Sequence, residues 1–239
     1  MSEKTVIIAR SPIAPTPPVV RTDGWEVSGR RAEAELTLTD CSPLTKVQLR
    51  APVGGQAAAA LGVRFGRAAR AGWAGGAGEA GNDAAGTLVV GSGPGEWLLL
   101  AAPGRAADLD LDAIAAQAPG EIVTWVDQTH GRALVRLSGQ RGPSMLAKLC
   151  GIDLSDDITP DGAAFRTSVA ALATDVIRDD LPGTVRSYLL HCERSSGQYL
   201  FDAMLRAGAE FGIEIDGFRM PDALPSPTTA LPSLTHPPS

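Results

Sequence analysis

Apolar residues in the first half of the chain occur in short stretches of a strand's length, either alternating with polar residues or in continuous runs. Residues 45–52 (TKVQLRAP) show the alternation clearly, and a proline ends the run. Short helices that end at glycine or proline separate these stretches. The expected elements are strands over residues 45–52, 87–90, 96–103 and 121–127 and helices over residues 56–62 and 106–118, with GSGPG (91–95) as a five-residue hairpin loop.

The second half shows a similar succession and ends in the longest helix of the chain. Residues 131–138 (GRALVRLS) alternate cleanly, which places Ala133, Val135 and Leu137 on one face of a strand. Residues 195–211 carry apolar side chains every three or four positions, as an amphipathic helix does. The other expected elements are a helix over residues 139–150, one or two strands over residues 165–176 and a strand over residues 185–192.

The order of these elements predicts an α+β fold. The elements run strand, helix, strand, strand, helix, strand from residue 45 to 127, and approximately the same again from residue 131 to 218. We therefore expect one duplicated α+β domain over residues 42–218, with halves at about 42–127 and 128–218. Mixed sheets with helices on one side are the packing expected for this order.

The two ends of the chain are rich in proline and lack a periodic apolar pattern. We expect residues 1–41 to form an extended N-terminal arm, which either lies along a partner or is solvated, and residues 219–239 to form a disordered Pro-rich tail. For the isolated chain we predict no regular secondary structure over residues 1–20 and 221–239, tested by amide exchange. The Gly-rich stretch over residues 71–86 predicts a flexible surface loop.

Length, composition and charge narrow the class of protein. The 239 residues are enough for a large hydrophobic core, and the apolar fraction of 44% is ordinary for a globular chain. A net charge of −6 does not suit a nucleic-acid binder, which has to neutralise phosphates. No apolar run is long enough for a membrane helix or a signal peptide, so we expect a cytoplasmic protein without membrane attachment.

The cysteines, histidines and acidic residues give no pattern of a metal site. The three cysteines lack CxxC spacing and are expected to be reduced thiols, and the three histidines are scattered. The acidic cluster SDDITPDG lacks the spacing of a calcium loop and is interpreted as a solvated loop. The residues concerned are Cys41, Cys150, Cys192, His130, His191, His236, Asp156, Asp157 and Asp161.

Three further motifs have both a chemical and a structural interpretation. GSGPG is followed by a strand and not by a helix, so a turn is favoured over a phosphate-binding loop. His191 and Cys192 are adjacent on a strand and point to opposite faces, so we predict that neither is catalytic. Residues 127–130 (DQTH) form either a site at a strand end or, as we prefer, a turn closed by Asp or Thr side chains.

The remaining polar residues do not complete a catalytic set. Cys150 ends a helix in an apolar setting, which is typical of a small core residue. Arg194 and Asp202 bracket the start of the long helix, where an acid favours the helix dipole. No serine stands in a GxSxG motif, although a triad dispersed along the sequence stays open. The residues alone therefore indicate an α+β protein with no catalytic, cofactor or metal residues assigned.

Several segments, in their order and spacing, resemble the gamma subunit of heterotetrameric sarcosine oxidase over roughly residues 42–212. The central segment is also similar to the folate-binding aminomethyltransferase superfamily, although the proline of its turn LSGQRGP (137–143) is displaced by two residues. The segments are SPLTKVQLRAP (42–52), GEWLLLAAPG (95–104), VDQTHGRALVRLSGQRGPSMLAKLCGIDL (126–154), FRTSVAALATDVI (165–177) and ERSSGQYLFDAMLRAGAEFG (193–212).

The resemblance implies a non-catalytic structural subunit beside alpha, beta and delta subunits. In such a complex the partner subunits hold FAD, FMN, NAD, tetrahydrofolate and zinc, and the gamma subunit binds none of them. The complex serves one-carbon metabolism, converting sarcosine to glycine, hydrogen peroxide and methylenetetrahydrofolate. Two alternatives are a gamma-type subunit of an N-methylglutamate dehydrogenase and a free-standing folate-dependent aminomethyltransferase-like protein. A small ligand-binding module is a third, favoured only if the chain alone binds folate.

The helix over residues 195–211 is the expected location of a partner surface. Tyr199 and Phe201 point to different sides of it, so one ring could pack on the core while the other faces outward as an anchor. Burial of both rings in the core of this chain is an equal alternative.

Overall fold

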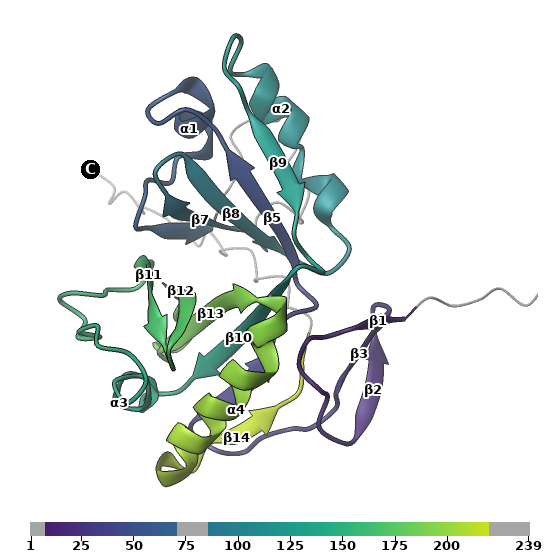
Figure 1. Cartoon of the computed structure of the whole chain (residues 1–239), viewed down its shortest axis with the longest axis vertical. Helices are drawn as coiled ribbons and strands as arrows, with labels where there is room; N and C mark the ends of the chain where they lie inside the picture. Colours follow the sequence, from purple (N-terminus) through teal and green to yellow (C-terminus); the bar gives the residue numbers. More distant parts are fainter. Residues whose placement is uncertain (1–7, 71–85, 220–239) are drawn as a thin grey trace, which may run out of the picture.

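The two large sheets of the protein pack face to face, and helices cover the outer face of each (Figure 1). The computed structural model describes residues 8–70 and 86–219. Leu88, Val90 and Leu98 of one sheet share a buried layer with Leu134 and Leu189 of the other. The succession of layers is therefore helices, sheet, sheet, helices, and the predicted α+β class is confirmed.

The five-stranded sheet is antiparallel throughout, in the order β6-β7-β8-β5-β9. Val47, Leu49 and Val89 face its helices and pack on Leu61 and Ile114. Its strands are β5 (Thr45–Arg50), β6 (Ala68–Arg70), β7 (Leu88–Gly93), β8 (Glu96–Ala101) and β9 (Thr124–Asp127), and its helices are α1 (Gln56–Leu61), η2 (Ala106–Leu109) and α2 (Leu111–Ala116).

The loop between β7 and β8 is shorter than the sequence predicts. Both strands extend into GSGPG, which leaves Pro94 and Gly95 as a two-residue turn. Gly95 has φ of 70°, a conformation that glycine adopts without steric cost at the third position of a type II turn. The register shifts between Gly91 and Gly93, so a bulge accommodates the rest of the expected loop inside the ladder.

The six-stranded sheet has the order β11-β12-β13-β10-β4-β14, with its only parallel pair among the described strands at β4 and β14. Its strands are β4 (Thr37–Asp40), β10 (Arg132–Ser138), β11 (Ala164–Val169), β12 (Leu172–Arg178), β13 (Ser187–Glu193) and β14 (Glu214–Asp216), and its helices are α3 (Gly142–Leu146), η3 (Arg194–Ser196), α4 (Gly197–Gly208) and η4 (Ala209–Phe211).

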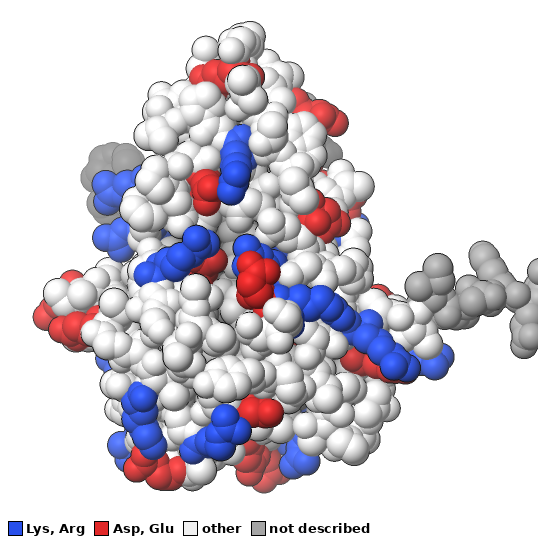
Figure 2. All heavy atoms as spheres, in the orientation of Figure 1, with Lys and Arg blue, Asp and Glu red and all other residues white. Residues whose placement is uncertain are grey.

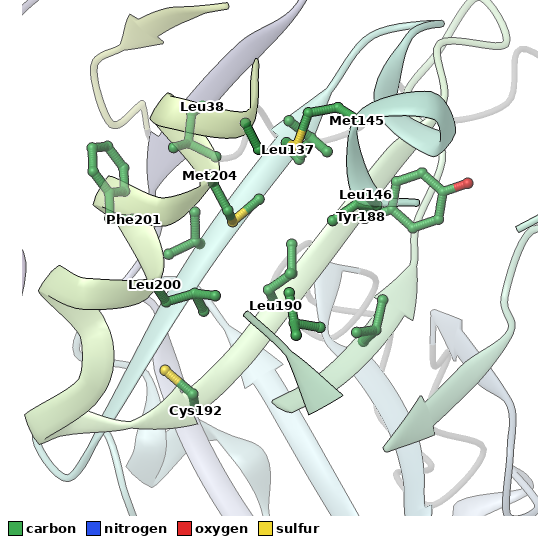
Figure 3. Close-up of a cluster of buried hydrophobic side chains, with 14 of the residues drawn as sticks. Leu38, Leu137, Met145, Leu146, Tyr188, Leu190, Cys192, Leu200, Phe201 and Met204 are labelled. Atoms are coloured by element: carbon green, nitrogen blue, oxygen red, sulfur yellow. The ribbon is translucent and has the colours of Figure 1, made fainter. Parts of the chain in front are cut away.

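Helix α4 closes the main hydrophobic core on the outer face of this sheet. Figure 3 shows Leu200 and Met204 of the helix directed at the strands, where Leu137 and Leu190 lie, and Phe201 belongs to the same buried cluster. Their spacing of one, three and four residues is what places them on one side of the helix. The predicted amphipathic helix is confirmed, with short 3-10 turns at both of its ends.

Each half of the main domain contains one more strand than the predicted unit. The observed succession is strand, helix, three strands, helix, strand in residues 45–127 and again in residues 132–216. In the first half the additional strand is β6, whose three residues, two Ala and one Arg, lack an apolar alternation that sequence reasoning could detect. Pairing with β7, and not its own pattern, makes this segment a strand.

The expectation of an extended arm over residues 1–41 is wrong for the described residues 8–41. β1 (Ala9–Arg10), β2 (Val19–Thr22) and β3 (Trp25–Ser28) form a three-stranded sheet, and β4 joins the six-stranded sheet. Apolar side chains after residue 24 supply the reason, since Trp25, Val27, Leu36 and Leu38 are all at most 5% exposed. The Pro-rich stretch lies between β1 and β2.

Other boundaries differ from the predictions in smaller ways. The helix expected over residues 106–118 is divided at Asp110, which has φ of 43°, into η2 and α2. The helix expected over residues 139–150 is regular only as α3. The Gly-rich loop up to residue 85 and the tail from residue 220 fall outside the described residues. No helix in the described ranges is long and apolar enough to cross a membrane.

Candidate functional site

Lys46 is the centre of a polar cluster buried between the two sheets. Its side chain is fully buried, and Nζ donates hydrogen bonds to the carbonyl oxygens of Ser42 (2.7 Å) and Leu44 (2.8 Å). Burial lowers the pKa of Lys46 to about 8, although the charges of Asp40 and Asp127 act in the opposite direction. The ammonium group thus closes the turn that leads from β4 into β5.

The sequence pattern placed Lys46 on the polar face of a half-buried strand. The structure buries both faces of β5 at this position, because α1 and α2 cover one and the six-stranded sheet covers the other. Alternation within a strand indicates which of its two faces is the more apolar, but it does not indicate whether the polar face is also covered. The burial of Lys46 could therefore not be predicted from the sequence of β5.

Replacing Lys46 with methionine is expected to change how stability depends on pH. Because the pKa is about 8 in the folded state and 10.5 as the ordinary value, the unfolded chain binds more protons between these values. The unfolding free energy of the wild type therefore rises through this window, by ~3 kcal/mol relative to Lys46→Met. Urea unfolding of both proteins at pH 7 and pH 10.5 measures the difference between their unfolding free energies. The contributions of the other titratable groups are the same in both proteins and cancel in this difference. A difference that stays constant with pH would contradict the burial of the charged form.

Residues 127–130 form a turn that is closed by the Asp and Thr side chains, as predicted in preference to a site at the strand end. Asp127 Oδ1 accepts a hydrogen bond from the Thr129 backbone N–H (2.8 Å), and Thr129 Oγ1 accepts one from the Lys46 backbone N–H (3.0 Å). His130 is exposed and stacks on Trp25, with ring centroids 4.9 Å apart. These polar groups secure the start of β10 beside β5, and they form no shared pocket.

His191 lies in a second polar group, in which His191 and Asp175 are buried and Arg166 reaches Asp175 from the exposed side. His191 Nδ1 is 3.2 Å from Asp175 Oδ2, and Arg166 Nε donates to Asp175 Oδ1 at 2.6 Å. Burial lowers the pKa of His191 and outweighs the carboxylate. For Asp175 burial raises the pKa, but the hydrogen bonds from His191 and Arg166 together outweigh it and hold the pKa below its usual range. A neutral imidazole beside an ionised carboxylate is the resulting state.

The structure separates His191 from Cys192, as strand alternation predicts. Cys192 packs in the core beneath α4 (Figure 3), where burial raises the pKa of its thiol to about 11. His191 instead contacts Asp175 on the neighbouring strand. A carboxylate that orients His191 does exist, on the neighbouring strand β12, and sequence reasoning missed it because Asp175 is paired only by sheet register. His191 Nε2 and Tyr188 Oη have no hydrogen-bond partner within the described residues.

An ion network joins the two sheets through Asp179. Arg70 of β6 donates to both carboxylate oxygens of Asp179 (2.9 Å each), and Arg136 of β10 donates to Oδ2 at 2.6 Å. Arg136 also donates to Ser187 Oγ, so the guanidinium connects two strands of the six-stranded sheet. The side chain of Asp179 is 9% exposed, which makes this a buried carboxylate with two cationic partners.

A polar cavity of about 250 Å³ lies next to this network, but its charged groups are engaged in pairs. Arg178 pairs with Asp180 (2.9 Å) and with Asp156 (2.6 Å). Asp161 accepts hydrogen bonds from the backbone of Gly162 and Asp180. The predicted acidic loop therefore forms ion pairs through Asp156 and accepts backbone hydrogen bonds through Asp161. Among the described residues no group of three or more His, Cys, Asp or Glu could hold a metal ion.

The other candidates also have structural roles. Arg194 donates to the backbone carbonyls of His130 and Arg10, which fastens the N-terminal sheet to the turn before β10. Asp202 accepts from Gln198 one turn earlier in α4. Cys150 packs at the edge of the main core, as predicted.

Comparison with known proteins identifies relatives of one kind. The chain is 32% identical over 145 residues to sarcosine oxidase subunit gamma of Corynebacterium sp. (strain U-96), and 30% identical over 135 residues to that of an Arthrobacter species. The chain is a relative of the sarcosine oxidase gamma subunits. The matches span 66% and 63% of those subunits, just under two thirds of their length, and 61% and 56% of this chain. No family model matches the sequence.

Solved structures agree with this relationship. Heterotetrameric sarcosine oxidase from Corynebacterium sp. U-96 contains a chain that superposes with a TM-score of 0.58 at 26% identity, covering 77% of this chain and 89% of that one. The aminomethyltransferase of the glycine cleavage system from Bartonella henselae shares the fold, with a TM-score of 0.60 at 16% identity over 84% of this chain and 55% of the enzyme. The resemblance to sarcosine oxidase gamma subunits is confirmed, and the likeness to the aminomethyltransferase concerns the fold.

Proposed function

We propose that this chain is a non-catalytic structural subunit of a heterotetrameric sarcosine oxidase-type complex. The observation that carries the proposal is the agreement of curated relatives named as gamma subunits with a structural match that covers 89% of a chain of that complex. The described ionisable clusters support it, since Lys46, Asp175 and Asp179 are all buried and hold strands and turns together.

The proposed complex removes the N-methyl group of sarcosine by oxidation. A hydride from the methyl carbon passes to FAD, and its electrons travel through FMN to oxygen, which takes up two protons to form hydrogen peroxide. Tetrahydrofolate accepts the one-carbon unit of the resulting imine as methylenetetrahydrofolate, and glycine is released. Alpha, beta and delta subunits would hold the flavins, NAD, folate and zinc, while this chain contributes packing surface.

Co-expression with these partners tests the proposal. We expect the tagged chain to be colourless when it is produced alone and to co-purify in equal stoichiometry with a flavin-coloured complex when the alpha, beta and delta subunits from the same genome are present. A well-behaved monomer that never associates with the flavoprotein subunits would refute the assignment. Flavin absorbance and subunit masses give the readout.

Experiments separate this proposal from two alternative functions, a gamma-type subunit of a related complex and, from a different class, a free-standing aminomethyltransferase-like protein. A gamma-type subunit of an N-methylglutamate dehydrogenase would co-purify with flavoprotein subunits that oxidise N-methylglutamate and not sarcosine. An aminomethyltransferase-like protein would bind tetrahydrofolate as the isolated chain, which calorimetry detects directly. The likeness to the Bartonella henselae enzyme motivates this second test.

We predict that His191 and Cys192 are dispensable for turnover in the assembled complex. Complexes that carry His191→Ala or Cys192→Ala are expected to keep the kcat of the wild type, because the two side chains lie on opposite faces of β13 and both are buried. Steady-state assays on complexes of verified stoichiometry provide the measurement. A loss of kcat above about a hundredfold with unchanged assembly, roughly 2.7 kcal/mol of transition-state stabilisation, would assign a catalytic role to that residue.

A further inference from the structure

Strand β9 forms an open and apolar edge of the five-stranded sheet. It is the last strand in the order β6-β7-β8-β5-β9, and all four of its residues are exposed. Val126 is 60% exposed and Trp125 37%, and Ile122 just before the strand is 81% exposed. Trp125 and Val126 are adjacent in the strand and point to opposite faces of the sheet, so the described part of the chain leaves apolar side chains uncovered on both faces of this edge.

The backbone of β9 offers hydrogen-bonding groups on its outer side. The N–H of Gln128 donates to the carbonyl of Lys46 at 2.7 Å, and Val126 and Thr124 stand opposite Gln48 and Arg50 in the same register. Because inward and outward groups alternate along an antiparallel strand, the N–H and C=O of Trp125 and Asp127 point away from β5. They have the spacing at which another strand pairs.

The other outer edges of the two large sheets are protected by charge. β6 ends in Arg70 and its outer side already pairs with the segment before β11, where the Ala68 N–H donates to the Gly162 carbonyl at 2.7 Å. β11 contains Arg166, and β14 contains Glu214 and Asp216. Charged side chains on an edge strand prevent pairing with another chain. β9 has neither a basic residue nor a proline nor a bulge, and its only charged residue, Asp127, comes last. An edge of this kind is suited to binding.

The six-stranded sheet shows how the corresponding edge is filled. β4 is the antiparallel neighbour of β10, just as β9 is the antiparallel neighbour of β5, and both β10 and β5 begin their halves. The outer edge of β4 is paired with β14, and Leu38 of β4 is fully buried. β9 and β14 are the last strands of their halves, but β14 is added outside β4, whereas β9 pairs with β5 directly and no described strand lies outside it.

The segment that leads into and contains β9 is acidic, and Arg50, which stands opposite Thr124 on β5, pairs with Glu96. Between residues 105 and 127 the only basic side chain is Arg105, whereas five acids occur, and four of these are exposed. Figure 2 shows acidic side chains along the outer margin of the lobe that holds β9 and α2. Complementary charge gives a docking segment its orientation and its rate of association. The acids are Asp108, Asp110, Asp112, Glu121 and Asp127, of which Glu121 is half-buried.

We propose that the outer edge of β9 binds an extended segment of a partner subunit, apolar in its middle and basic at its flanks, as an added β-strand. The inference rests on the proposed function, because that function supplies the partner. Main-chain hydrogen bonds to Trp125 and Asp127 would give the register, and the exposed apolar side chains would enter the interface core. The partner segment would thereby occupy beside β9, in trans, the place that β14 occupies in cis beside β4.

The test compares variants of β9 in the co-expressed alpha, beta and delta complex. Trp125→Pro removes an outward N–H without breaking the ladder to β5, and Trp125→Ala removes the side chain alone. We expect Trp125→Pro to lower the affinity of the chain for the flavoprotein subunits at least a hundredfold and Trp125→Ala to lower it less. Phe65→Ala is the matched control, because Phe65 is also an exposed aromatic residue, with 60% of its surface accessible, but lies outside β9. This variant should bind the flavoprotein subunits as tightly as the wild type.

Amide exchange on the wild type tests the same inference without any variant, so the test does not depend on whether the variants fold. The amides of Trp125 and Asp127 are expected to exchange fast in the free chain and at least tenfold more slowly in the complex. Unchanged exchange in an assembled complex, or wild-type affinity of folded Trp125→Pro, would overturn the β9 inference and leave the proposed function standing. If Tyr199→Ala lost binding while Trp125→Pro kept it, the interface would lie on α4. That result would also overturn the β9 inference. A wild type that never assembles would overturn both.

Discussion

Asp179→Ala is expected to destabilise the protein by ~3–5 kcal/mol, because it removes the common partner of two arginines that join the sheets. The substitution leaves the charge of Arg136 without its carboxylate partner, in a side chain that is only 16% exposed. Arg70 simultaneously loses both of its 2.9 Å hydrogen bonds across the seam between the sheets. Chemical denaturation at pH 7 measures the loss as a lower urea midpoint.

The control is an ion pair on the surface. Arg105 and Asp108 form a 2.9 Å pair with side chains that are 42% and 50% exposed, so Asp108→Ala should cost no more than about 1 kcal/mol. Asp179→Asn separates charge from hydrogen bonding, since the amide keeps an acceptor for one arginine. Equal effects of Asp179→Ala and Asp108→Ala would show that the network between the sheets does not contribute to stability.

Phe201→Ala is the second substitution with a large expected effect, ~3–5 kcal/mol. The ring is 3% exposed and lies in the core between α4 and the six-stranded sheet (Figure 3), so its removal leaves a cavity in addition to the lost burial. Thermal and urea unfolding of the isolated chain provide the measurement.

Tyr199→Ala on the same helix is the matched comparison. Tyr199 is 52% exposed and points to the other side of α4, so its truncation is expected to change stability by less than about 0.5 kcal/mol. The structure thus decides between the two interpretations of this helix: one ring is in the core and the other is outside. A loss for Tyr199→Ala comparable with that for Phe201→Ala would contradict this placement.

The sequence predicted those elements whose pattern is local. The strand over residues 131–138 and the helix over residues 195–211 correspond to β10 and α4, because a full alternation and a sustained spacing of three or four residues each specify one face. The turn at residues 127–130 was also predictable, since the Asp127 side chain reaches the backbone two residues later. Of the missed elements, β6 depends on pairing with β7, which follows only after a long loop, whereas β2 and β3 form a local hairpin around Asp23 and Gly24, a turn signal that the sequence interpretation did not use.

The buried polar clusters were beyond sequence reasoning for a related reason. Asp175 meets His191 only through the register of β12 and β13, and Asp179 meets Arg70 only where two sheets come together. Their separations along the chain, 16 and 109 residues, have no motif that marks them. Neither contact changes the periodicity of the strand in which it occurs.

What the sequence by itself determined is the α+β class, the amphipathic face of α4, the opposite orientation of adjacent strand residues and the resemblance to sarcosine oxidase gamma subunits. Only the tertiary structure decided that Lys46 is buried, that residues 8–41 are sheet, and that β9 keeps an open edge. The physical reason is that periodicity states which face of an element is apolar, whereas burial and edge pairing depend on which other segments the fold places against that element.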